Sequence, residues 1–197
     1  MEIVNFFEKM AGRWFSQRTT HALSSQQSKA GKSDLEVTFL APDTDEVQAL
    51  YIQTYGQVNG QENKDKPSAR LSPLCGLQIQ QSSTIEGDSK PTALTTLLVP
   101  LTAANDIDTV EPNSPTNGTF LRSGQAGTGP IKGSYSLEDE VLTFVTDGPE
   151  ASSTERLWFI NDNLRMRTGL TELSSGLRIA SFCSEIRLGV KPPKAEQ

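Results

Sequence analysis

The 197 residues are enough to bury one substantial core, and no linker separates two apolar halves, so we expect one domain over residues 1–190 and a disordered tail over 191–197. The 24 acidic residues outnumber the 18 basic ones, and the net charge of −6 comes without a basic cluster, which excludes a nucleic-acid partner. No apolar run approaches the roughly 20 residues that cross a bilayer, and the charged N-terminus is unlike a secretory signal, so we expect no membrane contact.

The chain begins with a predicted amphipathic helix and continues as strands. Spacings of three and four place apolar side chains on one helical face between Glu2 and Ala11. These side chains are Ile3, Phe6, Phe7 and Met10. Alternating apolar and polar residues then predict strands at Arg13–Leu23 and Ser33–Leu40, and a second short helix is predicted at Asp45–Tyr55.

The rest of the chain reads as short strands separated by turn residues. Polar loops are predicted at Gln57–Ser68 and Thr102–Asn117. The predicted strands are Ala69–Gln81, Thr92–Leu101, Gly118–Ser123, Pro130–Leu137, Val141–Thr146, Thr154–Ile160, Asn163–Leu173 and Gly176–Leu188. About ten strands without alternating helices indicate an all-β, up-and-down antiparallel barrel or a sandwich. Gly12-Arg13-Trp14, directly after an amphipathic helix, resembles the opening of lipocalin-like (calycin) barrels and favours the barrel.

The hairpin after Thr154 carries the side chains best suited to binding a ligand. Arg165 and Arg167 lie two apart on one strand, so they share a face and suit a clamp for carboxylates. Glu155 lies on the preceding strand. For all three the alternative is a solvated outer face. On the first strand, Arg18 and His21 point to opposite faces if the pleat is regular.

Other kinds of chemistry find no support in the sequence. His21 is the only histidine, and Cys75 and Cys183 lie far apart, so we expect two reduced thiols and no metal site. There is no nucleophile motif and no phosphate-binding loop.

Three segments together resemble the S-type phycobiliprotein lyases, the CpcS/CpeS family. They are GRWFSQRTTH at Gly12–His21, ERLWF and NLRMRT in the hairpin, and ASFCSEIR at Ala180–Arg187. The resemblance implies a lipocalin-like barrel that binds an open-chain tetrapyrrole and transfers it to a cysteine of an antenna apoprotein, forming a thioether. It implies no cofactor, because the bilin, which we expect to be phycocyanobilin, is the substrate. The partner would be a phycocyanin, allophycocyanin or phycoerythrin apo-subunit.

By this resemblance, Glu155 and Arg165 are the candidate catalytic residues, with Glu155 facing the pyrroles. Arg165 and Arg167 would contact the propionates or rings, and Arg18 and His21 would lie at the rim of the pocket. Catalysis would come from positioning, without either cysteine of this chain. We expect Glu155→Gln and Arg165→Ala to keep the fold and to lose transfer. The expected location is the cytoplasm of a cyanobacterium or a plastid stroma, and the protein could act as a homodimer or with a related subunit.

The sequence departs from the family on the strand beginning at Ala69, which lacks the tryptophans that members usually carry. Fewer aromatic faces should weaken stacking on a bilin. Pro73 cannot donate to a strand ladder, so this strand should lie at an edge or be bulged. Two alternatives therefore stay open: a non-catalytic subunit of a heteromeric lyase, and a carrier of fatty acids or other hydrophobic acids.

Overall fold

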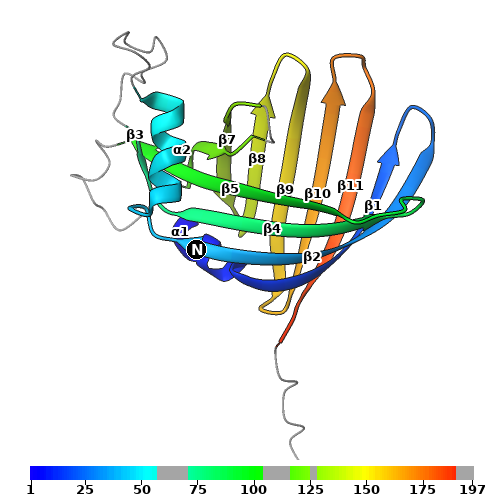
Figure 1. Ribbon diagram of the computed structural model, residues 1–197, viewed down its shortest axis with the longest axis horizontal. Helices are drawn as coiled ribbons and strands as arrows, with labels where there is room; N and C mark the ends of the chain where they lie inside the picture. The colour runs from blue at the N-terminus through cyan, green and yellow to red at the C-terminus, as the bar shows by residue number, and fades with distance from the viewer. Residues whose placement is uncertain (57–70, 104–115, 125–127, 190–197) are drawn as a thin grey trace, which may run out of the picture.

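The computed structural model describes residues 1–56, 71–103, 116–124 and 128–189, which form two helices and eleven strands (Figure 1). The helices are α1 (Ile3–Met10) and α2 (Asp45–Tyr55). The strands are β1 (Gly12–Ala22), β2 (Gln27–Leu40), β3 (Leu71–Pro73), β4 (Gly76–Ile85), β5 (Thr92–Ala103), β6 (Asn117–Arg122), β7 (Ile131–Glu138), β8 (Val141–Asp147), β9 (Ala151–Asn161), β10 (Leu164–Leu173) and β11 (Arg178–Arg187). Neither helix is long and apolar enough to cross a membrane.

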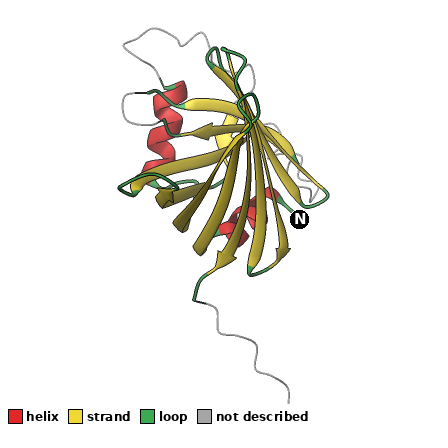
Figure 2. Ribbon diagram, turned by 90° about the vertical axis from the view of Figure 1, so that its right-hand side faces the viewer, coloured by secondary structure: helices red, strands yellow, loops and turns green. Residues whose placement is uncertain are grey.

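Ten of the described strands close into an antiparallel barrel. Around the ring the order is β5, β4, β2, β1, β11, β10, β9, β8, β7 and β6, and the β5–β6 pairing completes the circle. The short β3 pairs with the end of β5. Figure 2 shows the wall from the side, with the strands fanning around the interior. The prediction of an all-β, up-and-down barrel of about ten strands with an N-terminal helix is confirmed.

Helix α1 fills one end of the barrel. The four apolar residues of its predicted face are at most 3% exposed and pack among inward side chains of the wall, as their spacing predicts. The helix ends before Gly12, which has a φ of +123°. L side chains rarely adopt this φ, so glycine is required at this turn, and its missing Cβ also leaves room for the end of the Arg187 side chain. The buried Trp14 then donates from Nε1 to the carbonyl oxygen of Met10 at 2.9 Å.

Helix α2 has the predicted bounds and lies outside the barrel, where Figure 1 shows it standing beside the β5 end of the sheet. Its buried Val47 and Leu50 pack on outward side chains of β5 and β6. We call these side chains and the helix residues the outer cluster: Val47, Leu50, Leu97, Val99, Leu101 and Leu121. The barrel therefore has one apolar core inside the wall and a smaller one outside it.

Most predicted strands match the structure to within three residues at each end, and two differ more. Ala69–Gln81 is broken into β3 and β4, because Pro73 has no N–H to donate and the chain leaves the ladder at Leu74. The N–H of Leu74 donates to the carbonyl oxygen of Pro100 instead. Strand β2 starts at Gln27, earlier than predicted. The sequence did not indicate this start, because both faces of the first half of the strand are polar and show no alternation. The predicted loop at Gln57–Ser68, most of the loop at Thr102–Asn117 and the tail lie outside the described residues.

Candidate functional site

The register of four neighbouring strands arranges inward side chains in rows at different depths. Antiparallel pairing sets residues of β1, β11, β10 and β9 directly opposite one another. The lower row, next to α1, is Ser16, Glu185, Arg165 and Phe159. The middle row is Arg18, Cys183, Arg167 and Leu157. The upper row is Thr20, Ser181, Gly169 and Glu155. Depth in the barrel is thus fixed by position along each strand.

A cavity of about 630 Å³ occupies the barrel above the lower row. Middle-row and upper-row residues line one wall, and Met10 of α1 contributes to its lining. The remaining lining includes Ile79, Gln81, Thr96, Leu98, Arg122, Phe144, Thr146 and the β8–β9 turn. Because α1 fills the space below, only the upper part of the interior is open to a ligand.

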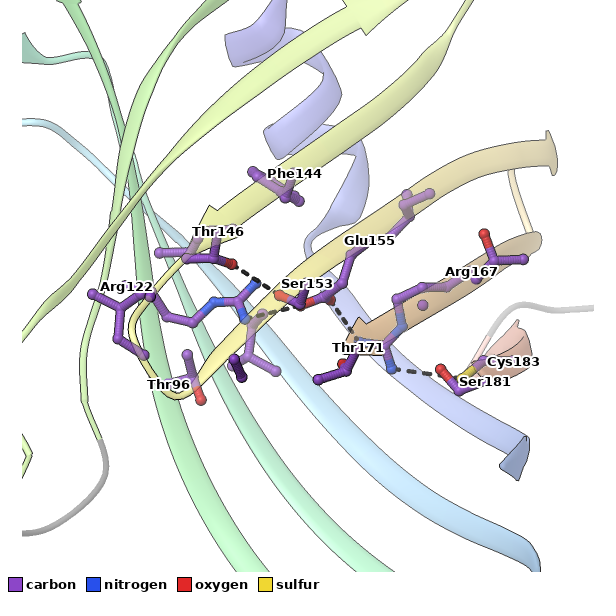
Figure 3. Close-up of a pocket in the computed structure, with 18 of the residues that line it drawn as sticks. Thr96, Arg122, Phe144, Thr146, Ser153, Glu155, Arg167, Thr171, Ser181 and Cys183 are labelled. Carbon is purple, nitrogen blue, oxygen red and sulfur yellow. Dashed lines mark hydrogen bonds and ion pairs between the residues drawn. The ribbon is translucent and has the colours of Figure 1, made fainter. Parts of the chain in front are cut away.

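Charged side chains of alternating sign run along the cavity wall and continue below it. Nη1 of Arg122 lies 2.9 Å from Oε1 of Glu155, and Oε2 of Glu155 lies 3.9 Å from Nη1 of Arg167. Nη2 of Arg167 lies 3.0 Å from Oε1 of Glu185, whose Oε2 lies 2.5 Å from Nε of Arg165. Figure 3 shows Arg122, Glu155 and Arg167 in line, with Cys183 beyond them. The two carboxylates are therefore each held between two guanidinium groups.

Glu155 is the acidic residue of this series that a ligand can reach. Burial alone would raise the pKa of its carboxyl group, but the charges of Arg122 and Arg167 outweigh burial and hold that pKa below its ordinary value. The carboxylate is therefore ionised at neutral pH. Its side chain is 27% exposed and lines the cavity. It can accept hydrogen bonds from N–H groups of a bound molecule.

Arg165 and Arg167 both point inward, as their spacing predicts, but only Arg167 reaches the cavity. Arg165 is 3% exposed, donates from Nη1 to the carbonyl oxygen of Met10 at 3.1 Å and lies over the ring of Trp14. It is not among the residues that line the cavity. Arg165 instead lies below the cavity, against Met10 and the ring of Trp14, so its contact with a ligand stays a prediction that the cavity lining does not support.

Glu185 was not identified from the sequence, although the structure makes it the partner of both arginines. Its side chain is 1% exposed and also accepts a hydrogen bond from Oγ of Ser16 at 3.3 Å. Burial would raise the pKa of this carboxyl group, but Arg167 and Arg165 together lower it. The alternation of Ser181, Cys183 and Glu185 on one face of β11 was the available signal. Arg122, on the distant β6, had none.

The predicted rim pair is separated by the pleat. Arg18 lies in the middle row and lines the cavity. His21 is exposed on the outer face of β1, so it does not reach the cavity and its predicted contact is corrected. The regular pleat, without a bulge in the β1 pairings, is the reason.

Both cysteines are free thiols in different surroundings. Cys75 is fully buried in the core, and burial raises its pKa to about 12. Cys183 lines the cavity, and burial raises its pKa despite the opposing charge of Arg167. Neither thiol ionises at neutral pH, so neither is an activated nucleophile. The described residues include no group of His, Cys, Asp and Glu placed to hold a metal ion.

Comparison with known proteins connects this barrel to one family. A family model described as CpeS-like protein matches residues 2–188. A chromophore lyase CpcS/CpeS of Thermosynechococcus vestitus is 38% identical over 195 residues, which cover 98% of this chain and 96% of the relative. The chain belongs to the CpcS/CpeS family of chromophore lyases.

A second curated relative and one solved structure are also similar to this chain. A phycocyanobilin lyase subunit CpcS of Picosynechococcus is 27% identical, and the match covers 96% of this chain and 88% of the relative. The solved structure of the S-type phycobiliprotein lyase CPES from Guillardia theta superposes with a TM-score of 0.73 at 24% identity, covering 97% of this chain and 95% of that structure. The latter likeness supports the fold.

Proposed function

We propose that this lyase binds a bilin in the barrel cavity and transfers it to a cysteine of a phycobiliprotein apo-subunit. The observation that carries the proposal is the ionised Glu155 on the wall of the 630 Å³ cavity. Pyrrole nitrogens offer a row of N–H donors, and a carboxylate held between guanidinium groups accepts them without taking up a proton. The relatives from Thermosynechococcus and Picosynechococcus are cyanobacterial, which supports the cytoplasm of such a cell as the location, with a plastid stroma as the alternative.

Arg167 is the second residue that we assign to the ligand. Its Nε is buried and has no hydrogen-bond partner among the described residues, although both its Nη atoms lie near carboxylates. An unpaired buried donor costs stability unless an acceptor is supplied. A carbonyl oxygen of a bound bilin would supply one. We assign Arg165 a supporting part, because it orients Glu185 and thereby Arg167.

The thioether bond would form on the partner's cysteine and would involve neither cysteine of this chain. The sulfur of the partner's cysteine adds to the ethylidene group of the bilin A ring, the C–S bond forms, and the thiol proton passes to the other carbon of the former double bond. No group leaves. The lyase contributes by holding one bilin conformation with the reactive carbon presented to the partner. The raised pKa of Cys183 keeps this chain's cavity thiol protonated and out of competition.

The cavity wall also supports a second candidate function, a non-catalytic subunit of a heteromeric lyase. On β4 the lining side chains are Ile79 and Gln81, and Phe144 is the single aromatic residue among the described lining residues. The predicted shortage of stacking surfaces therefore extends to the cavity. A weakly held bilin would need a partner subunit to complete its pocket.

The first test compares the binding of phycocyanobilin by the native chain and by Glu155→Gln. Loss of the charged acceptor should weaken binding about tenfold to a hundredfold, because a hydrogen bond to a charged group contributes roughly 1.5–3 kcal/mol. The shifted visible absorption band of the bilin measures the affinity. Glu36→Gln, which removes the same charge from the exposed face of β2, is the matched control and should bind as the native chain does. Unchanged affinity in Glu155→Gln would remove this residue from the site.

The second test separates the two candidate functions. Native protein is incubated with phycocyanobilin and apo-phycocyanin, with and without a related subunit, and the covalent fluorescent adduct is measured after denaturation. An adduct formed by this chain alone supports the lyase, and an adduct that requires the second subunit supports the helper. If the bilin spectrum changes neither with this chain alone nor with the two subunits together, both candidates are rejected and the carrier of hydrophobic acids remains.

A further inference from the structure

Arg18 differs from the other arginines of the barrel interior in having no partner. Arg122, Arg165 and Arg167 each pair with Glu155 or Glu185. Arg18 makes no hydrogen bond or ion pair with any residue that the structure describes, although it lines the cavity. A guanidinium group in a partly enclosed site is the preferred partner of a carboxylate. This cation is therefore available for a ligand.

A second compartment opens beside Arg18, beneath the β1–β2 hairpin that is drawn in blue in Figure 1. It measures about 390 Å³ and shares Arg18, Thr171 and Ser181 with the main cavity, so the two lie next to each other. Lys29 of β2 is its second cation, and its described lining contains no acidic residue. The carboxylate of Glu86 lies near this hairpin but is bound to the backbone N–H of Ala30. The compartment is thus positively charged.

The upper row connects this compartment to Glu155. Lys29 pairs with Thr20 across the β1–β2 ladder and so extends the row by one strand. With a strand spacing of about 4.8 Å, four steps separate Lys29 from Glu155 by roughly 19 Å along the wall. The residues between them are small: Thr20, Ser181 and Gly169. A Cβ at Gly169 would lie 2.7 Å from Oγ of Ser181. Glycine therefore leaves space for a ligand along this part of the wall.

We propose that Arg18 and Lys29 form a carboxylate-binding subsite, which holds the acidic side arms of the substrate while Glu155 accepts its N–H groups. The inference rests on the proposed function, and for a bilin the acidic arms are its two propionates. From the sequence, contact with the propionates was predicted for Arg165 and Arg167. Both of those guanidinium groups are already paired with Glu185, and Arg167 is also near Glu155, whereas Arg18 has no competing carboxylate among the described residues.

The test is a cycle of two ligands and two proteins. Biliverdin and its dimethyl ester share the tetrapyrrole and its N–H groups, but the ester lacks both negative charges. The native chain should bind the acid at least tenfold more tightly than the ester, and Arg18→Gln/Lys29→Gln should bind the two ligands alike. Lys32→Gln, which removes an exposed cation from the outer face of the same strand, should keep the native preference. High salt should reduce the preference in the native chain.

Each outcome separates the subsite from the function on which it rests. Equal affinity of the native chain for acid and ester would overturn the subsite and leave bilin binding intact. A native preference that persists in the double variant would also overturn it. If neither ligand binds the native chain, the proposed function fails and the subsite fails with it. The single variant Lys29→Gln alters only an exposed residue, so its partial loss of preference provides the readout should the double variant misfold.

Discussion

At the scale of single residues, the lower and middle rows show why two arginines of one strand have different functions. Arg165 and Arg167 share a face of β10, yet one is enclosed beneath the cavity and the other borders it. Glu185 joins them, with one oxygen facing each guanidinium group. A buried carboxylate of this kind depends on both partners, because removal of either leaves charge without compensation.

Arg165→Ala tests this dependence. We now expect it to destabilise the fold by about 3–5 kcal/mol, because Glu185 would keep its charge in the interior with one cation fewer. Urea unfolding monitored by circular dichroism measures the change. Arg156→Ala, on the exposed outer face of β9, should change the free energy of unfolding by less than about 0.5 kcal/mol. A variant as stable as the native chain would contradict the structural part assigned to Arg165 and restore the simpler expectation drawn from the sequence.

The sequence predicted which face these residues share but not how deep each lies. Alternation along β10 is a local property, so the inward direction of Arg165 and Arg167 followed from their spacing. Their partners come from other strands: Glu185 of β11 pairs with both arginines, and Glu155 of β9 pairs with Arg167. Whether Arg165 contacts a ligand depends on where α1 packs inside the barrel. That packing is a tertiary feature, which the local pattern of β10 does not contain. Spacing alone therefore identified candidates and left their roles open.

At the scale of elements, α1 acts as the base of the site because its C-terminal end is firmly bound. Arg187 donates from Nη2 to the carbonyl oxygen of Lys9 and from Nη1 to that of Ala11. The guanidinium groups of Arg187 and Arg165 both lie over the ring of Trp14, at 4.2 and 4.1 Å from its centroid. Cations at a helix C-terminus also complement its partial negative charge. The helix is thus fixed where the cavity begins.

Phe7→Ala tests the helix as a filler of the barrel. Phe7 is fully buried and meets Phe144, which lines the cavity, in an edge-to-face contact with centroids 6.4 Å apart. Truncation should cost about 3–5 kcal/mol in the free energy of unfolding, and it should deepen the cavity toward the base. Thermal and urea unfolding report the first effect. Glu8→Ala, on the exposed face of the same helix, is the control, and equal effects of the two substitutions would show that α1 is not packed as described.

The two helices were predicted with nearly their observed bounds because each carries its own local pattern. The strand expected at Ala69–Gln81 was not, because its break at Leu74 depends on a hydrogen bond to Pro100 from another strand. Likewise, the polar start of β2 has no alternation to mark it and is defined by its partners β1 and β4. Elements with one apolar face were readable from the sequence, and elements defined by their neighbours were not.

At the scale of the whole molecule, the barrel is closed unevenly around its circumference. The β1–β2 ladder runs from Gly12 to Ala22, whereas the closing ladder between β5 and β6 uses only Leu98–Leu101 of β5. Pro100 within that short stretch has no N–H to contribute. The outer cluster beneath α2 covers this same seam. We infer that apolar contacts outside the wall compensate for a short ladder within it.

Amide hydrogen exchange should therefore find the seam the least protected part of the wall, with β6 opening locally while β1 and β11 exchange through global unfolding. Leu121→Ala, which removes a fully buried side chain of the outer cluster, should accelerate exchange in β6 and the end of β5 roughly tenfold or more, since a buried Leu→Ala change costs at least about 2 kcal/mol. Leu170→Ala, at an exposed position of β10, should leave all rates unchanged. Acceleration spread equally over every strand would mean that the seam opens only when the whole barrel unfolds. In that case α2 would stabilise the fold as a whole and not the β5–β6 pairing in particular.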